Sequence, residues 1–323
     1  MTRANTSPRV GCAGLLVQDT FCGLLAAWPA EGELTVLQEM PASAGGCAAN
    51  VALDLARQGI DAEVVGCVGR DLAAGVLLES LERHKVGTLR IKQIEDLPTS
   101  TTVILLIQGQ DRRYLHVMGA NKAFTTDQIA RDWVRSLDVF YFGGLFALPG
   151  VELAKLVELL QFCRRSAVTT VLDVAVPHDQ RGLSDLTGLL HLVDVFLPNE
   201  DEARAFTGFS DPKDQLRALQ QMGADTVIIT RGAHGVVAGR AGTIWRCGAY
   251  QMAVIDPSGC GDAFTSGVIS GILRRWSMPE MLRYASAVGA SATRALGTTQ
   301  SVFTAPEAAE FVKAHPITVT EEP

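Results

Sequence analysis

The sequence lacks a basic surplus, a long apolar run and a recognisable leader. Its 323 residues carry a net charge of −7, whereas a nucleic-acid or anionic-membrane partner normally requires a basic surface. No uninterrupted apolar run reaches about 18 residues, and the first residues lack the apolar core of a signal peptide. We therefore expect a cytoplasmic protein that binds neither nucleic acid nor a membrane.

Several common site motifs are also missing. The seven cysteines are odd in number and show no C-x-x-C spacing, which indicates reduced thiols rather than a disulfide framework. The six histidines show no H-E-x-x-H spacing, so no zinc centre is expected. The chain has neither the G-x-x-x-x-G-K-[ST] loop of P-loop kinases nor a G-x-G-x-x-G segment after its first predicted strand. These absences argue against a P-loop kinase and against a nicotinamide-dependent enzyme.

What is present is an alternation of short apolar strands and amphipathic helices. The predicted strands are 10–16, 63–67, 139–142, 168–173, 195–198 and 226–230. The predicted helices are 47–58, 72–83, 151–165, 201–206, 214–222, 262–276 and 279–296. Strands that alternate with crossover helices indicate an α/β fold whose mostly parallel sheet is covered by helices on both faces.

Two regions interrupt this alternation. Residues 18–42 contain no good helix, and residues 99–108 and 112–118 read as a hairpin around Gly109. We expect these pieces to form a small antiparallel sheet outside the main body, which closes over a ligand or pairs with a second subunit. An ordinary surface hairpin is the alternative.

The segment most informative about chemistry is 256–262, which reads Asp-Pro-Ser-Gly-Cys-Gly-Asp. Gly259 and Gly261 allow consecutive backbone N–H groups to point into one concavity at the positive end of the following helix. Such a concavity binds anions and can stabilise charge on a transferring phosphoryl group. Asp262, in the first helical turn, can accept a proton from an attacking hydroxyl. The alternative is a glycine turn with an aspartate cap.

A second block of interest lies far upstream. Gly45 and Gly46 permit close backbone approach, and the amide of Asn50 offers both a donor and an acceptor to neighbouring hydroxyls. Asp19 follows shortly after the first predicted strand. Taken singly, these residues also fit a glycine helix start and an exposed turn aspartate.

Together these segments resemble the signatures of the pfkB/ribokinase family of carbohydrate and nucleoside kinases. Residues 256–262 are similar to the family's Asp-Thr-x-Gly-Ala-Gly-Asp, with Pro257 in place of threonine and Cys260 in place of alanine. Residues 45–50 are similar to its Gly-Gly-x-x-x-Asn block. The resemblance covers residues 9–312. It implies one kinase domain with a ribokinase-like three-layer α/β/α sandwich and a small β-sheet lid formed from about 18–42 and 99–118.

The resemblance also implies a role for each matching residue. The residues implied in phosphoryl transfer are the base Asp262 and the backbone amides of Gly259, Cys260 and Gly261. Those implied in holding the acceptor are Asp19, Gly45, Gly46 and Asn50.

Further matches lie on the nucleotide side. Asn199 and Glu202 match the family's Asn-x-x-Glu, which acts mostly through water on the Mg²⁺ that accompanies ATP. The turn that lines ATP in the family is matched by Thr230, Gly232 and Gly235. A monovalent cation such as K⁺ is expected beside Asp256, Ser258 and Ser301.

The implied activity is ATP-dependent phosphorylation of a primary hydroxyl of a small sugar. Ribokinases carry a lysine where Cys47 stands and a glutamate after the strand at 139–142, where this chain has Gly143 and Gly144. These departures argue against ribose as the acceptor. A nucleoside kinase and a catalytically inactive sugar-binding regulator are the alternatives, and a homodimer formed through the lid is expected.

Overall fold

The computed structural model describes residues 8–175 and 184–322. The main sheet contains β1 (Arg9–Gly14), β4 (Asp61–Val68), β5 (Gly87–Gln93), β8 (Val139–Leu145), β9 (Thr169–Val174), β10 (Val195–Phe196), β11 (Thr226–Thr230), β12 (Val236–Arg240), β13 (Thr243–Cys247) and β14 (Val319–Glu322). The helices are α1 (Cys47–Arg57), α2 (Leu72–Arg83), α3 (Arg131–Arg135), α4 (Leu153–Arg165), α5 (Ser184–Thr187), α6 (Glu200–Thr207), α7 (Pro212–Gln221), α8 (Cys260–Arg274), α9 (Met278–Ala292) and α10 (Ala305–Ala314).

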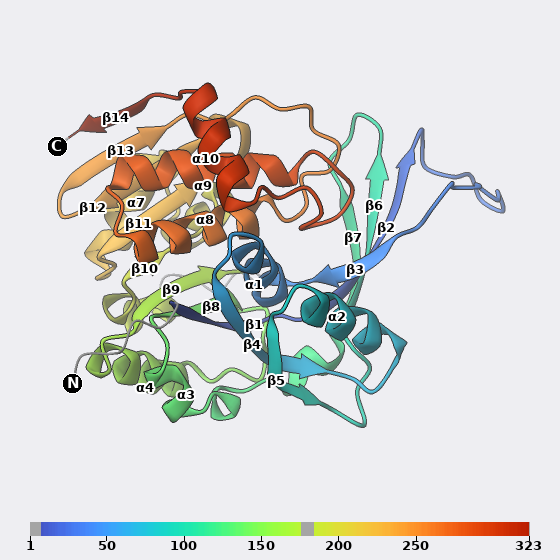
Figure 1. The fold of residues 1–323 in the computed structure, drawn as a ribbon, viewed down its shortest axis with the longest axis horizontal. Coiled ribbons are helices and arrows are strands. Elements are labelled where there is room, and N and C mark those ends of the chain that lie inside the picture. Colours follow the sequence, from blue (N-terminus) through green and yellow to red (C-terminus); the bar gives the residue numbers. More distant parts are fainter. Residues whose placement is uncertain (1–7, 176–183, 323) are drawn as a thin grey trace.

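The ten strands follow the order β14-β13-β12-β11-β10-β9-β8-β1-β4-β5 (Figure 1). From β11 to β5 every neighbouring pair is parallel. The last three strands, β12 to β14, are antiparallel additions at one edge. The mostly parallel sheet predicted from the alternating pattern is therefore confirmed.

Successive residues of the central strands pack into opposite cores. On β8, Phe140 and Phe142 belong to the core shared with α4 and α6. Val139 and Tyr141 belong to the core shared with α1, α8 and α9. Because helices bury both faces of the sheet, a binding site can open only where the strands end.

A separate four-stranded sheet projects from one side of the main body (Figure 1). It contains β3 (Ala42–Gly45), β2 (Val17–Leu25), β6 (Thr101–Ile107) and β7 (Arg113–Val117), in that spatial order. The predicted hairpin is present as β6 and β7. The expectation of a wholly antiparallel sheet was wrong, because β2 and β6 pair in parallel. Each of these two strands enters the small sheet from the main body, so both run outward in the same direction.

Some element boundaries differ from the predictions. The first strand ends at Gly14 rather than at residue 16, and the helix expected to reach residue 296 ends at Ala292. The helix expected to begin at Asp262 begins at Cys260, two residues earlier. Among the described residues, no helix is long and apolar enough to span a membrane.

Candidate active site

Asp262 lies in the first turn of α8, where it meets α1. Asn50 of α1 donates from Nδ2 to Asp262 Oδ2 at 2.8 Å. The Oδ1 atom of the same amide accepts a hydrogen bond from Thr298 Oγ1 at 2.9 Å. Asn50 is thereby held in one orientation, and the two segments that the sequence placed far apart meet at one carboxyl group.

The proton affinity of Asp262 is set by opposing influences. Burial raises the pKa of its carboxyl group from 3.8 to about 6, while hydrogen bonds from Asn50 and Cys47 lower it. A carboxyl group with this pKa is ionised at neutral pH and binds a proton more tightly than an exposed aspartate does. Both properties suit a general base.

The start of α8 has the backbone of an anion-binding site. Gly259 has φ +76°, and a Cβ atom there would overlap the carbonyl oxygen of Thr298, so the position requires glycine. At Gly261, by contrast, a Cβ would meet nothing within 4 Å. No described side chain caps this helix. The N–H of Cys260 makes only a long hydrogen bond of 3.5 Å to the carbonyl oxygen of Pro257, so the start of the helix can still offer N–H groups to an anion.

A cavity of about 350 Å³ adjoins the start of α8. Cys260 and Gly261 line it, as do all three residues predicted to line ATP, which are Thr230, Gly232 and Gly235. The side chains of Tyr250 and Met252 are also among its walls. The predicted nucleotide residues are therefore gathered beside the predicted phosphoryl-binding amides.

Asn199 and Glu202 lie at the start of α6, close to the end of β11 that contains Thr230. Asn199 pairs with Thr230 through an isolated bridge. Its Oδ1 accepts from the backbone N–H of Glu202 at 2.9 Å, and Glu202 Oε2 accepts from the backbone N–H of Asn199 at 2.9 Å. This reciprocal capping box explains both residues structurally. Burial also raises the pKa of Glu202 to about 7, and the charge of Asp262 contributes to the rise.

Asp19 lies on β2 and is buried, which excludes the exposed turn position. A Cβ on the facing Gly45 would overlap the carboxyl group of Asp19, so the glycine permits the contact. Burial raises the pKa of Asp19 to about 7, against a hydrogen bond from Thr102 that lowers it. Thr102 Oγ1 is in turn 3.0 Å from Nδ1 of His116. The small sheet thus presents a polar group toward the site.

The three residues expected beside a monovalent cation have different surroundings. Asp256 is fully buried, and its two oxygens accept from the backbone N–H groups of Ser258 at 2.9 Å and Gly297 at 3.1 Å. The buried Oγ of Ser258 has no hydrogen-bond partner among the described residues. Ser301 Oγ instead donates to backbone carbonyls at the end of α9.

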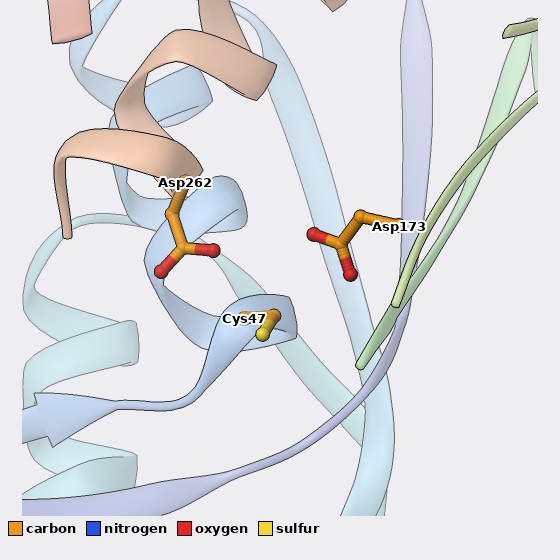
Figure 2. A group of neighbouring side chains, drawn as sticks. All are labelled: Cys47, Asp173 and Asp262. Carbon is orange, nitrogen blue, oxygen red and sulfur yellow. The ribbon is translucent and has the colours of Figure 1, made fainter. Parts of the chain in front are cut away.

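Two residues that the sequence analysis did not assign to the site lie beside Asp262. One oxygen each of Asp173 and Asp262 and the Sγ atom of Cys47 lie within 4.8 Å of one another, and the carboxyl groups flank the thiol (Figure 2). Asp173 is the last but one residue of β9. A carboxylate at the carboxyl end of a parallel strand is the signal that would have found it, because ligands bind at that edge.

This cluster is a poor magnesium centre. Burial raises the pKa of the Cys47 thiol well above its usual value, so the sulfur stays protonated. Mg²⁺ prefers oxygen ligands and near-ideal octahedral geometry. We therefore interpret the three side chains as a polar wall of the site.

Comparison with known proteins agrees with this geometry. A family model described as pfkB family carbohydrate kinase matches residues 16–305. Ribokinase of Haemophilus influenzae is 27% identical over 290 residues, which cover 87% of this chain and 91% of that protein. Aminoimidazole riboside kinase of Salmonella typhimurium is 25% identical over 285 residues, covering 84% and 88%.

Comparison with solved structures agrees with the sequence comparison. The structure of Arabidopsis thaliana ribokinase complexed with ribose and ATP matches with a TM-score of 0.80 at 22% identity, over 95% of this chain and 99% of the other. That likeness shows a ribokinase-like fold with its small separate sheet. Because the family model spans most of the sequence, the chain belongs to the pfkB family of carbohydrate kinases.

Proposed function

We propose that this kinase transfers the γ-phosphoryl group of ATP to a primary hydroxyl of a small sugar. The observation that carries the proposal is the meeting of three features: the half-buried base Asp262 with its raised pKa, the uncapped start of α8 and the adjoining 350 Å³ cavity. Positioning and charge stabilisation are what phosphoryl transfer requires of a protein.

In the proposed mechanism, the acceptor hydroxyl attacks the γ-phosphorus as its proton passes to Asp262. A new P–O bond forms, the bond to ADP breaks, and the amides of Gly259, Cys260 and Gly261 stabilise the charge on the transferring oxygens. Asp19 and Asn50 hydrogen-bond to other acceptor hydroxyls. Gly45 makes room for the carboxyl group of Asp19, Gly46 fits against the carbonyl oxygen of Leu15, and the small sheet excludes water.

Mg²⁺ and a monovalent cation both fit residues on the nucleotide side. Asn199 and Glu202 would hold Mg²⁺ through water, and the ion would neutralise phosphate charge when bound. The buried, unpartnered Oγ of Ser258 beside Asp256 fits a K⁺ ligand. The hydroxyl of Ser301 donates to the end of α9, and its carbonyl oxygen accepts a hydrogen bond from Arg294, so Ser301 fits such a site less well than Ser258 does.

A nucleoside acceptor is the second candidate. One similar relative is by name an aminoimidazole riboside kinase. Cys47, Gly143 and Gly144 also depart from the residues that ribokinases carry. The intact Asp262 and glycine amides make an inactive sugar-binding regulator the weaker alternative.

We also propose that two copies associate through the lid, the sheet formed by β3, β2, β6 and β7. β7 is an edge strand of this sheet, and its Tyr114, Leu115 and Val117 are 52%, 61% and 53% exposed. An uncovered strand edge with apolar side chains tends to pair with another chain. A second copy of the same edge would cover it.

The activity is tested by ADP release from MgATP with D-ribose, D-fructose, other pentoses and hexoses, and adenosine. At least one acceptor should stimulate ADP release and yield a phosphate monoester detectable by phosphorus NMR. If no acceptor stimulates release although a sugar binds by calorimetry, the protein is a binding regulator and the proposal is wrong.

A further inference from the structure

The acceptor side of the site contains a carboxyl group with no assigned part in phosphoryl transfer. Asp173 and Asp262 flank Cys47, with one oxygen of each and the sulfur all within 4.8 Å of one another. Figure 2 shows the two carboxyl groups turned toward each other from β9 and α8, above the first residue of α1. A single hydroxyl or amine placed between them could reach both.

Asp173 is held rigidly from one side. The O–H of Tyr141 donates to its Oδ2, and the backbone N–H of Gly144 donates to its Oδ1 at 2.6 Å. Each carboxylate oxygen accepts two hydrogen bonds. Among the described residues, one acceptor position on each oxygen is therefore left over on a side chain whose orientation is already set.

The residues at the end of β8 have no side chains that could occupy the position beside Cys47 where the carboxyl group of Asp173 lies. A Cβ on Gly143 would lie 2.8 Å from Cβ of Cys47 and closer still to the hydroxyl of Tyr141. Gly144 has φ +73°, where a side chain is strained. The neighbouring strand β9 therefore supplies the carboxyl group at this edge.

The charge around the pair is incompletely balanced. Burial raises the pKa of Asp173 well above its usual value, and the charge of Asp262 raises it further. None of the main influences on the pKa of either carboxyl group comes from a lysine or an arginine of the described residues. Hydrogen-bond donors on a bound molecule would lower the energetic cost of placing two carboxyl groups so close together. A further hydrogen-bond acceptor would raise that cost.

We propose that Asp173 is a second acceptor-binding carboxyl group, which accepts a hydrogen bond from a hydroxyl or amine of the acceptor other than the hydroxyl that is phosphorylated. The inference rests on the proposed function. The favoured substrates are accordingly polyhydroxy or amino-substituted acceptors. An analogue that lacks one particular donor should bind and react poorly.

The test pairs Asp173→Asn with removal of single hydroxyls from the acceptor. D-ribose, D-fructose and adenosine are assayed for ADP release beside their monodeoxy analogues, and kcat/KM is measured for each. In the natural enzyme, loss of one specific hydroxyl should lower kcat/KM about 10-fold or more, because the carboxyl group of Asp173 would lose a hydrogen-bond partner inside the site. In Asp173→Asn the same loss should cost less than about 3-fold, mostly through KM.

Asp194→Asn is the matched control. Asp194 also accepts one backbone N–H and one hydroxyl, both from Thr170, but it lies immediately before β10 and not at the site. It should keep the full discrimination. If Asp173→Asn does not fold, Tyr141→Phe keeps the carboxyl group and removes one of its two donors, and it should weaken the same discrimination.

The outcomes separate the two proposals. If acceptors are phosphorylated but every deoxy penalty is the same in Asp173→Asn as in the natural enzyme, Asp173 has a structural role only and this inference is wrong. If no acceptor stimulates ADP release in the natural enzyme, the kinase proposal fails and the inference fails with it.

Discussion

At the scale of single residues, Asn50 and Thr298 decide how Asp262 is presented. Asn50 Nδ2 binds the oxygen Oδ2 of Asp262, and Thr298 Oγ1 occupies the other end of the same amide. With the amide of Asn50 and the thiol of Cys47 as donors, the carboxyl group of Asp262 still has acceptor positions left for the acceptor hydroxyl. Because desolvation outweighs the hydrogen bonds, the carboxyl group stays more basic than an exposed aspartate.

Replacing Asp262 by asparagine should abolish most turnover without loosening nucleotide binding. The amide cannot accept the proton, so kcat should fall about 10³-fold, while the affinity for ATP measured by calorimetry should stay within about 2-fold. Asp225→Asn serves as the control, since Asp225 is exposed and its carboxyl group contacts only neighbours outside the site, an ion pair with Arg240 and a hydrogen bond from Thr226 Oγ1 among them. An Asp262→Asn variant with the natural kcat would remove this residue from the role of base.

The raised pKa values predict an acid limb in the pH profile. The proton must be absent from Asp262, with a pKa of about 6, and the acceptor is held best by an ionised Asp19, with a pKa of about 7. Lowering the pH through this window protonates both groups, so kcat/KM should fall with an apparent pKa between about 6 and 7. Initial rates of ADP release at constant ionic strength measure it, and a profile that stays flat to about pH 5 contradicts the assignment.

At the scale of elements, the lid is coupled to the loop that follows α9. Phe21 of β2 and Ile104 and Leu106 of β6 form a small core, and Leu296 packs against it from the loop. The same loop contributes Thr298 to the amide of Asn50. Arg57 at the end of α1 donates to the carbonyls of Thr299 and Gln300 at 2.6 and 3.1 Å. A shift of the lid is therefore expected to change the positions of Thr298 and Asn50, which orient the base Asp262.

Shortening Leu296 to alanine should weaken this coupling. With less apolar contact under the lid, the closed arrangement is less favoured, so KM for the acceptor should rise about 3- to 10-fold with a smaller change in KM for ATP. Acceptor-independent hydrolysis of ATP should rise as well, because water is excluded less well. Steady-state kinetics measure both effects. Leu34→Ala is the matched control, since Leu34 is 87% exposed, and equal effects in the two variants would contradict the coupling.

At the scale of the whole molecule, the exposed edge of the lid is the feature that bears on association. The main sheet ends in β14 on one side and β5 on the other, whereas the lid ends in β3 and in the uniformly exposed β7. The apolar residues of β7 gain most from a partner, because each is more than half exposed. A two-fold pairing of β7 edges is the simplest way to cover them.

If the lids pair, Leu115→Asp should convert a dimer into a monomer. The charge would be buried against the second copy at a cost that exceeds the gain from the apolar contact. Sedimentation velocity over a range of protein concentrations measures the change. Leu89→Asp, at the fully exposed Leu89 of β5, should leave the association unchanged. A natural protein that sediments as a monomer at every concentration excludes the lid dimer.

Much of this architecture could be predicted from the sequence, because the sequence patterns that indicate it are local. Period, glycine punctuation and apolar runs predicted the parallel sheet, and the resemblance of 256–262 and 45–50 to the family signatures implied which residues would hold the phosphoryl group and the acceptor. The structure confirms the fold and shows these segments gathered at one place, while the roles themselves stay predictions. The parallel pairing of β2 with β6 was not predicted, because it depends on the direction in which two distant segments leave the main sheet.

The sequence was sufficient for the class of chemistry, since two glycines and a carboxylate at the start of a helix carry their geometry with them. The surroundings of the acceptor depended on the assembled fold. Asp173, Cys47 and Asp262 come from β9, α1 and α8, and no local pattern records that these three elements converge. Burial raises the pKa of both carboxyl groups, and the charge of Asp262 raises that of Asp173 further, which is a property of the folded site and not of any one segment.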